Sequence, residues 1–90
     1  MYSGIILHHG VIAEILDAAG GGKRIRVEAP QVMDRIQPGS SVNIDGVCLT
    51  ATECDENSFL TDAMPQTLEL TTVPSWKAGQ VVNIEPSLRL

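Results

Sequence analysis

The chain has 90 residues, enough for one small domain with one hydrophobic core, and its composition shows no shift or linker that would divide it. Its net charge is -5 and its six basic residues are scattered, so it lacks the positive potential that nucleic-acid binding requires. The apolar amino-terminal segment has neither the basic start nor the cleavage-like end of an export signal, and we predict no membrane span. We therefore expect a single domain over residues 1–90, with neither nucleic acid nor membrane as a partner.

The amino-terminal half reads mainly as strands. Residues 4–16 are rich in Ile, Leu and Val and predict a strand with a bend or bulge at Gly10. Residues 17–22 end in three glycines and predict a mobile hairpin loop, because the Lys-Ser/Thr ending and following helix of a phosphate-binding loop are absent. Residues 24–29 alternate between polar and apolar, as a half-buried strand does. A proline then ends this strand and begins a predicted short helix over residues 30–36.

The carboxy-terminal half continues the same pattern. Residues 41–54 predict one strand whose apolar positions are even-numbered before Gly46 and odd-numbered after it, so we expect a β-bulge at that glycine. Further strands are predicted over residues 58–63 and 81–85, with a helical turn over residues 65–70. Short strands separated by turn signals, with little helix, predict a small closed antiparallel barrel.

Cysteine and histidine positions give no sign of a disulfide or a metal. Cys48 and Cys54 fall on one predicted strand, about 20 Å apart, which is too far for a disulfide. We expect both thiols to be reduced, which fits a cytoplasmic protein. No histidine lies in sequence range to activate Cys48, so packing in the core explains it at least as well as a nucleophile does. The adjacent His8 and His9 point to opposite faces of a strand, and we predict no metal site.

The hairpin between the third and fourth predicted strands brings two polar segments together. Cys48 and Thr50 share the face opposite Leu49, which is the outward face if Leu49 is in the core. A turn centred on the middle of the connecting loop sets Thr50 opposite Asp62 and Cys48 opposite Met64. A hydroxyl, a thiol, a carboxylate and a thioether would then converge on one surface.

The helical turn that follows adds to this surface. Pro65 fits the first position of a helix, and the unpaired amides of that first turn would point back toward the polar segments, with Thr67 nearby. Many short donors and acceptors beside modest apolar surface suit a flat, uncharged, heteroatom-rich ring.

Four segments in order resemble the amino-terminal lumazine-binding domain of riboflavin synthase: residues 1–5, 45–52, 64–68 and 77–85. The resemblance implies an all-β fold, a small six-stranded antiparallel Greek-key barrel with one or two short helices. Two such barrels occur in tandem in that family, and each active site lies between the first barrel of one subunit and the second barrel of another. The enzyme transfers a four-carbon unit between two molecules of 6,7-dimethyl-8-ribityllumazine, giving riboflavin and a pyrimidinedione.

The resemblance also implies which residues contact the ligand. They are Gly4, Ile5, Ile6, Cys48, Leu49, Thr50, Asp62, Ala63, Met64, Pro65, Gln66 and Thr67. Gly4 would let the backbone approach the ligand edge, and Thr50 and Thr67 would supply hydroxyls. Asp62 would accept from ribityl hydroxyls or brace the site. The alternative without a ligand is that Thr50 and Thr52 are good strand formers and Thr67 is a helix-start residue. No catalytic residue is assigned, and no cofactor is implied beyond ribityllumazine or riboflavin as ligand.

Departures from the family limit the expected activity. The family continues past the position of Leu90 into a second barrel, so half of each shared site would be missing. Asp45 replaces the usual Asn, Ser3 the usual Thr and Tyr2 the usual Phe. We expect a homodimer or homotrimer that binds a pterin or flavin with little turnover. Two alternatives remain, a non-enzymatic flavin or lumazine carrier and a ligand-free β-barrel interaction module.

Overall fold

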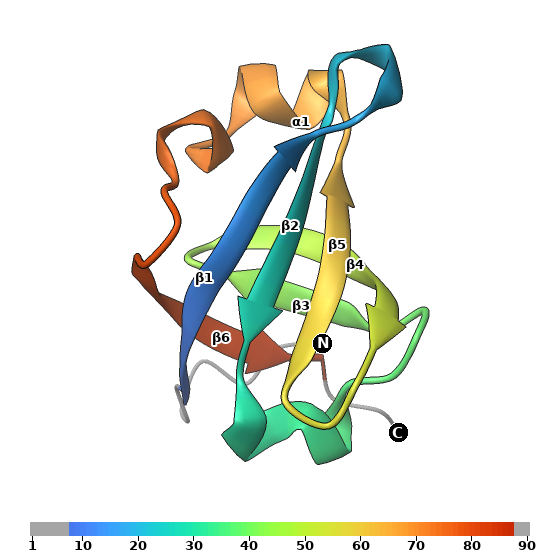
Figure 1. The fold of residues 1–90 in the computed structure, drawn as a ribbon, viewed down its shortest axis with the longest axis vertical. Coiled ribbons are helices and arrows are strands. Elements are labelled where there is room, and N and C mark those ends of the chain that lie inside the picture. The colour runs from blue at the N-terminus through green and yellow to red at the C-terminus, as the bar shows by residue number, and fades with distance from the viewer. Residues whose placement is uncertain (1–7, 88–90) are drawn as a thin grey trace.

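The computed structural model describes residues 8–87, in which six antiparallel strands close into a barrel in the order β1-β2-β5-β4-β3-β6 (Figure 1). The strands are β1 (His8–Asp17), β2 (Lys23–Glu28), β3 (Ser41–Ile44), β4 (Val47–Cys54), β5 (Ser58–Ala63) and β6 (Val81–Pro86). One helix, α1 (Pro65–Leu70), and three 3-10 turns, η1 (Ala19–Gly21), η2 (Pro30–Arg35) and η3 (Val73–Ser75), connect them. The predicted closed six-stranded antiparallel barrel is confirmed.

The core follows from the alternation of side chains along the strands. On β2, Ile25 and Val27 point inward and are fully buried, whereas Arg24 and Arg26 point outward. Aliphatic residues from the other strands fill the rest of the interior, and Phe59 is the largest fully buried side chain. The short connecting segments contribute further buried residues: Val32, Ile36, Val73 and Trp76.

Gly10 marks the place where β1 changes partner. Residues 8–11 pair with β6, and residues 11–17 pair with β2. A Cβ at Gly10 would lie 2.9 Å from the carbonyl oxygen of Glu28 and 3.0 Å from the Ile84 side chain, so only glycine fits between the two neighbouring strands. The strand continues through Gly10 as predicted, but the irregular register falls two residues later, between Ile12 and Glu14.

The prediction of one strand over residues 41–54 with a bulge at Gly46 is wrong. Asp45 and Gly46 form a two-residue turn between β3 and β4, with φ angles of 46° and 88°. Positive φ at both positions is the signature of the type I′ hairpin turn, in which Asp-Gly is favoured. The turn places Ile44 opposite Val47, so both face the core, and this explains the switch of parity. Asp45 also joins β6, because its Oδ1 accepts a hydrogen bond from the Asn83 amide at 2.6 Å.

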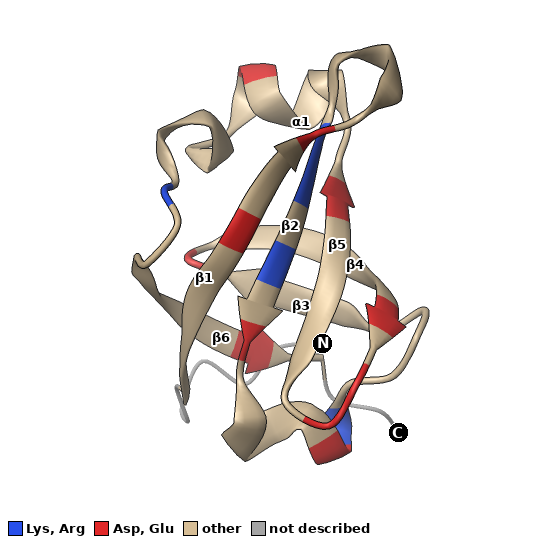
Figure 2. Cartoon of the chain, in the orientation of Figure 1, with Lys and Arg blue, Asp and Glu red and all other residues tan. Residues whose placement is uncertain are grey.

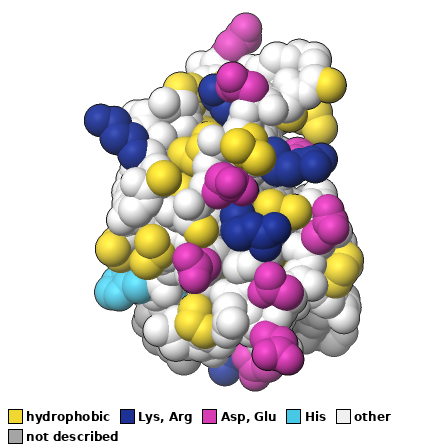
Figure 3. Space-filling view, in the orientation of Figure 1, with side chains coloured by type: hydrophobic (Ala, Val, Ile, Leu, Met, Phe, Trp, Pro, Cys, Tyr) yellow, Lys and Arg dark blue, Asp and Glu magenta, His cyan; other side chains and the backbone are white. Residues whose placement is uncertain are grey.

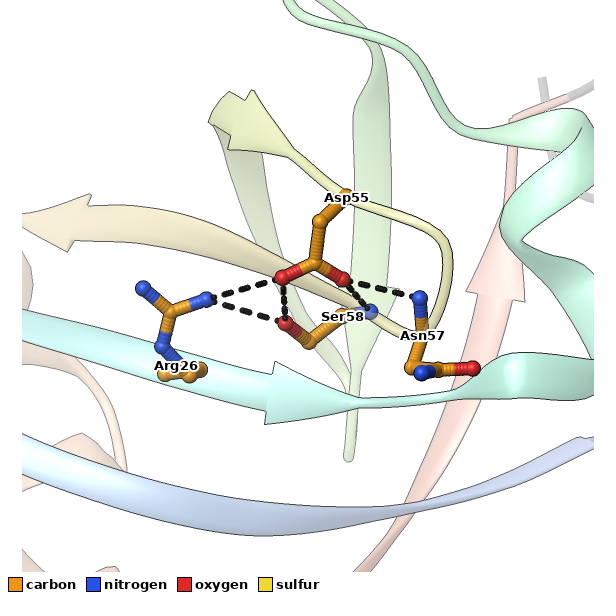
Figure 4. Close-up of polar contacts among 4 residues, drawn as sticks. All are labelled: Arg26, Asp55, Asn57 and Ser58. Atoms are coloured by element: carbon orange, nitrogen blue, oxygen red, sulfur yellow. Dashed lines mark hydrogen bonds and ion pairs between the residues drawn. The ribbon is translucent and has the colours of Figure 1, made fainter.

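A polar network stabilises the turn between β4 and β5 (Figure 4). Asp55 Oδ1 accepts hydrogen bonds from the backbone amides of Asn57 and Ser58, at 2.8 and 2.7 Å. Its Oδ2 accepts from Ser58 Oγ and from Arg26 Nη1, at 3.0 and 3.4 Å. The two backbone hydrogen bonds are the main reason that the pKa of Asp55 is lowered. The network ties the turn to β2 through Arg26.

Candidate ligand-binding site

Two outward residues of β4 behave as the sequence predicts. Cys48 and Thr50 are exposed, and Leu49 between them is buried at 6% exposure. The alternative that Cys48 packs in the core is therefore wrong, because the side chain of Cys48 is exposed. Both Cys48 and Cys54 are free cysteines, as expected. We call the outward groups Cys48, Thr50, Asp62 and Met64 the outer wall.

The pairing of β4 with β5 leads up to the outer wall. Ala51 lies opposite Thr61, and Thr61 Oγ1 donates a 2.8 Å hydrogen bond to the Thr50 carbonyl oxygen. Continued by one residue, this register sets Thr50 opposite Asp62, in agreement with the prediction, and the pairing of Cys48 with Met64 stays a prediction. Near the turn the strands pair one residue out of the predicted register, because Cys54 opposes Phe59. An unpredicted irregularity after Ala51 then restores the predicted register.

Asp62 is held by an arginine that the sequence analysis did not single out. Arg24 on β2 is the cross-strand partner of Asp62, and its Nε and Nη2 donate to Asp62 Oδ1 and Oδ2 at 3.0 and 3.5 Å. The Asp62 side chain is 26% exposed, so its carboxylate can accept further hydrogen bonds while it is braced. The hydrogen bond with Asp62 raises the pKa of Arg24, which stays cationic. The alternation along β2 predicts that Arg24 faces outward, but not which acid it meets.

The chain after β5 exposes the rest of the predicted segment. Met64 is 61% exposed and precedes α1, in which the Leu68 amide donates to the Met64 carbonyl oxygen at 3.1 Å. Pro65 and Gln66 are exposed and Thr67 is partly buried. The start of this helix at Pro65 is confirmed.

Two predicted site residues have side chains that do not face the wall. Ala63 and Leu49 are in the core, so they can offer a ligand only backbone groups and otherwise support the wall from behind. Gly4, Ile5 and Ile6 lie outside the described residues.

Ser41 extends the outer wall onto β3. It pairs with Thr50 across the strands, and its Oγ lies 2.9 Å from Cys48 Sγ. The sequence analysis missed Ser41 because it treated residues 41–54 as one strand. The Asp45-Gly46 dipeptide was the signal that could have found it, because a two-residue hairpin there brings Ser41 back alongside Thr50.

Other features of the described residues lie apart from the outer wall. A hollow of about 540 Å³ contains none of the four wall groups; its lining is Asn43, Asp45, Gly46, Thr72, Ser75, Trp76, Gln80, Asn83, Ile84 and Glu85. No cluster of three or more metal-binding side chains occurs among residues 8–87. The helices in this part of the chain are all too short to cross a bilayer.

The fold and the outer wall define a class of protein: a small closed β-barrel that presents hydroxyl, thiol, carboxylate and thioether groups on its outer face. The family model described as Lumazine binding domain matches residues 3–87, and the chain belongs to this family. A crystal structure of LumP complexed with 6,7-dimethyl-8-(1'-D-ribityl) lumazine has the same fold, with a TM-score of 0.85. That superposition covers 97% of this chain and 49% of LumP at 23% sequence identity.

Similar curated proteins are riboflavin synthases. The protein from Schizosaccharomyces pombe is 34% identical over 85 residues, which are 94% of this chain and 41% of that protein. The protein from Chlamydia pneumoniae is 35% identical over 91 residues, covering 100% of this chain and 45% of that protein. The protein from Bacillus subtilis is 31% identical, covering 98% and 40%. The predicted family resemblance is thus confirmed, and the chain spans less than half the length of these relatives.

Proposed function

We propose that this chain binds ribityllumazine or riboflavin, with the fused ring lying against the outer wall. One observation carries the proposal: the pairing of Ala51 with Thr61, continued by one residue, sets Thr50 opposite Asp62 in a chain whose residues 3–87 match the lumazine-binding domain. The complex of LumP with a ribityllumazine supports this choice of ligand.

The chemistry of the wall suits such a ligand. Cys48 and Thr50 offer short polar groups for the edge of the ring, and the Met64 thioether offers a polarisable apolar contact for its face. Asp62 accepts from ribityl hydroxyls while Arg24 holds its carboxylate. In this proposal the backbones of Leu49 and Ala63, the start of α1 from Pro65 to Thr67, and the segment Gly4 to Ile6 complete the contacts.

The wall serves as half of a riboflavin synthase site. The reaction requires two ribityllumazines held face to face, so positioning supplies much of the rate acceleration. One barrel holds one of them, and a second barrel holds the other. In a homodimer or homotrimer of this chain, a second copy would supply that barrel. We also propose a cytoplasmic location, which the two free cysteines support.

A fluorescence titration tests the proposed ligand. Ribityllumazine and riboflavin are added separately to the protein and to two variants, Thr50→Val and Thr52→Val. Thr52 is the matched control, because it is also exposed on β4 but lies outside the wall and donates to the Leu60 carbonyl oxygen. We expect saturable binding at micromolar protein that Thr50→Val weakens and Thr52→Val does not. Absence of saturation with both ligands would refute the proposal and favour the ligand-free interaction module.

A second candidate function is a non-enzymatic carrier of lumazine or flavin. The fold shared with LumP, which was crystallised with a ribityllumazine, favours it. Incubating saturated protein with ribityllumazine alone and separating the products by chromatography distinguishes the two. Riboflavin would establish the enzyme, whereas unchanged ligand would rule out a catalytic homodimer and favour the carrier. Sedimentation with and without ligand shows whether a second barrel is recruited.

A further inference from the structure

We propose that two residues at the start of β2, Gly22 and Arg24, are positioning residues for the ligand site. Neither belongs to the outer wall, and this inference rests on the proposed function. Figure 1 shows the β1–β2 loop lying beside the end of β5 and the start of α1. The two residues contact the segment from Asp62 to Met64 from the side of β2.

Gly22 is in direct contact with the backbone of this segment. It is buried, and a Cβ on it would lie 2.6 Å from the Ala63 carbonyl oxygen and 3.6 Å from Met64 Cα. A carbonyl oxygen of the backbone cannot rotate away as a flexible side chain can. Gly22 itself has an ordinary extended conformation, with φ −84° and ψ −171°. The need for glycine here therefore comes from the close approach of two backbones and not from backbone strain.

Arg24 on β2 makes the second contact, two residues further along the chain. Its guanidinium holds both carboxylate oxygens of Asp62, and Lys23 between the two positioning residues is the cross-strand partner of Ala63. One contact thus acts on the Asp62 side chain and the other on the Ala63 carbonyl. Together they set the direction in which the chain leaves β5, and so where Met64 projects.

β2 also provides a control for the arginine. Arg26 faces outward two residues further along, and it pairs with Asp55 in the β4–β5 turn at the other end of β5. Figure 2 shows basic positions on β2 between acidic positions on β1 and β5. Figure 3 shows basic and acidic side chains interleaved on this face. Arg24 and Arg26 therefore hold different aspartates, and Arg26 also donates to Ser58 Oγ at 2.9 Å.

The test compares four variants in pairs. Gly22→Ala introduces the backbone clash, whereas Gly20→Ala introduces only torsional strain, because Gly20 has φ 83° and nothing within 4 Å of its Cβ position. Arg24→Gln releases Asp62, whereas Arg26→Gln leaves it paired. We expect Gly22→Ala and Arg24→Gln to weaken ribityllumazine binding about tenfold, the amount expected for loss of one hydrogen bond to the ligand. The two controls should stay within about twofold of the unmodified chain.

A readout without ligand separates this inference from the proposed function. The methyl NMR resonance of Met64, assigned with Met64→Leu, should shift in Gly22→Ala and Arg24→Gln and stay in place in both controls. Thermal unfolding confirms that binding is measured on folded protein. If Gly22→Ala does not fold, the comparison of Arg24→Gln with Arg26→Gln still tests the inference. Equal effects of Arg24→Gln and Arg26→Gln on both readouts would overturn the inference. A Met64 shift in a chain that binds neither ligand would uphold the positioning of Met64 and refute the proposed function.

Discussion

Thr61→Val tests whether the strand pairing beneath the outer wall depends on one buried hydrogen bond. Thr61 is fully buried, and its Oγ1 donates to the Thr50 carbonyl oxygen at 2.8 Å. Valine keeps the branched shape of the side chain and removes the donor. The hydrogen bond is partly buried, so removing its donor should cost about 1–3 kcal/mol.

The same structure supplies a matched control on the other strand. Thr52 also donates from its hydroxyl across the β4–β5 pair, to the Leu60 carbonyl oxygen at 3.2 Å, but it is exposed. Water can take over that hydrogen bond, so Thr52→Val should change the free energy of unfolding by no more than about 0.5 kcal/mol. The difference in unfolding free energy between the two variants thus measures the effect of burial on a hydrogen bond of the same kind.

Thermal and urea unfolding measure both variants. A loss of 1 kcal/mol lowers Tm by about 4–8 °C in a domain of this size, so Thr61→Val should melt at least about 4 °C below the unmodified chain. Ribityllumazine affinity should fall in the same variant, because Thr50 is no longer tied to β5. Equal Tm values for the two valine variants would refute the reasoning.

Three further predictions concern acid stability, glycine positions and thiol reactivity. Folding lowers the pKa of Asp55, so the carboxylate stabilises the fold fully above about pH 4, and this stabilisation is lost as pH falls through the lower folded pKa. The unfolding free energy of Asp55→Asn should therefore depend less steeply on pH in acid than that of the unmodified chain. Gly46→Ala, which meets no atom within 4 Å but has φ 88°, should cost about 1–2 kcal/mol by urea unfolding, the price of left-handed backbone. Cys48, which is exposed, should react with iodoacetamide before Cys54, whose pKa is raised by burial, and bound ribityllumazine should slow the reaction.

Each of these predictions has a control and a contrary result. Glu56→Gln removes a charge from the same turn as Asp55, and an acid titration identical to that of Asp55→Asn would contradict the linkage. Gly10→Ala tests steric contact instead of torsion, and it should cost about 1–3 kcal/mol through overpacking against the Glu28 carbonyl. Full stability of Gly46→Ala would contradict the turn assignment. Mass spectrometry locates the alkylated thiol, and faster modification of Cys54 would contradict the assigned exposures.

The site could be anticipated only in part. The outward face of β4 follows from local alternation, and the family motifs indicated which segments contact a ligand. Arg24 could not be assigned to Asp62, because the two residues are 38 positions apart and nothing local specifies that β2 and β5 are neighbours. The contact of Gly22 with Ala63 was missed for the same reason, and its glycine run was interpreted only as a mobile turn.

The sequence by itself determined the class of fold and the positions of most elements, because alternation, prolines and turn residues act over a few neighbours. The helical turn over Pro65–Leu70 and the strand over Ser58–Ala63 were predicted to the residue. The tertiary structure alone decided the order of strands around the barrel, and with it the pairing of Thr50 with Ser41, the irregularity after Ala51 and the support of the outer wall by β2. These depend on contacts between distant segments, which exist only once the barrel has closed.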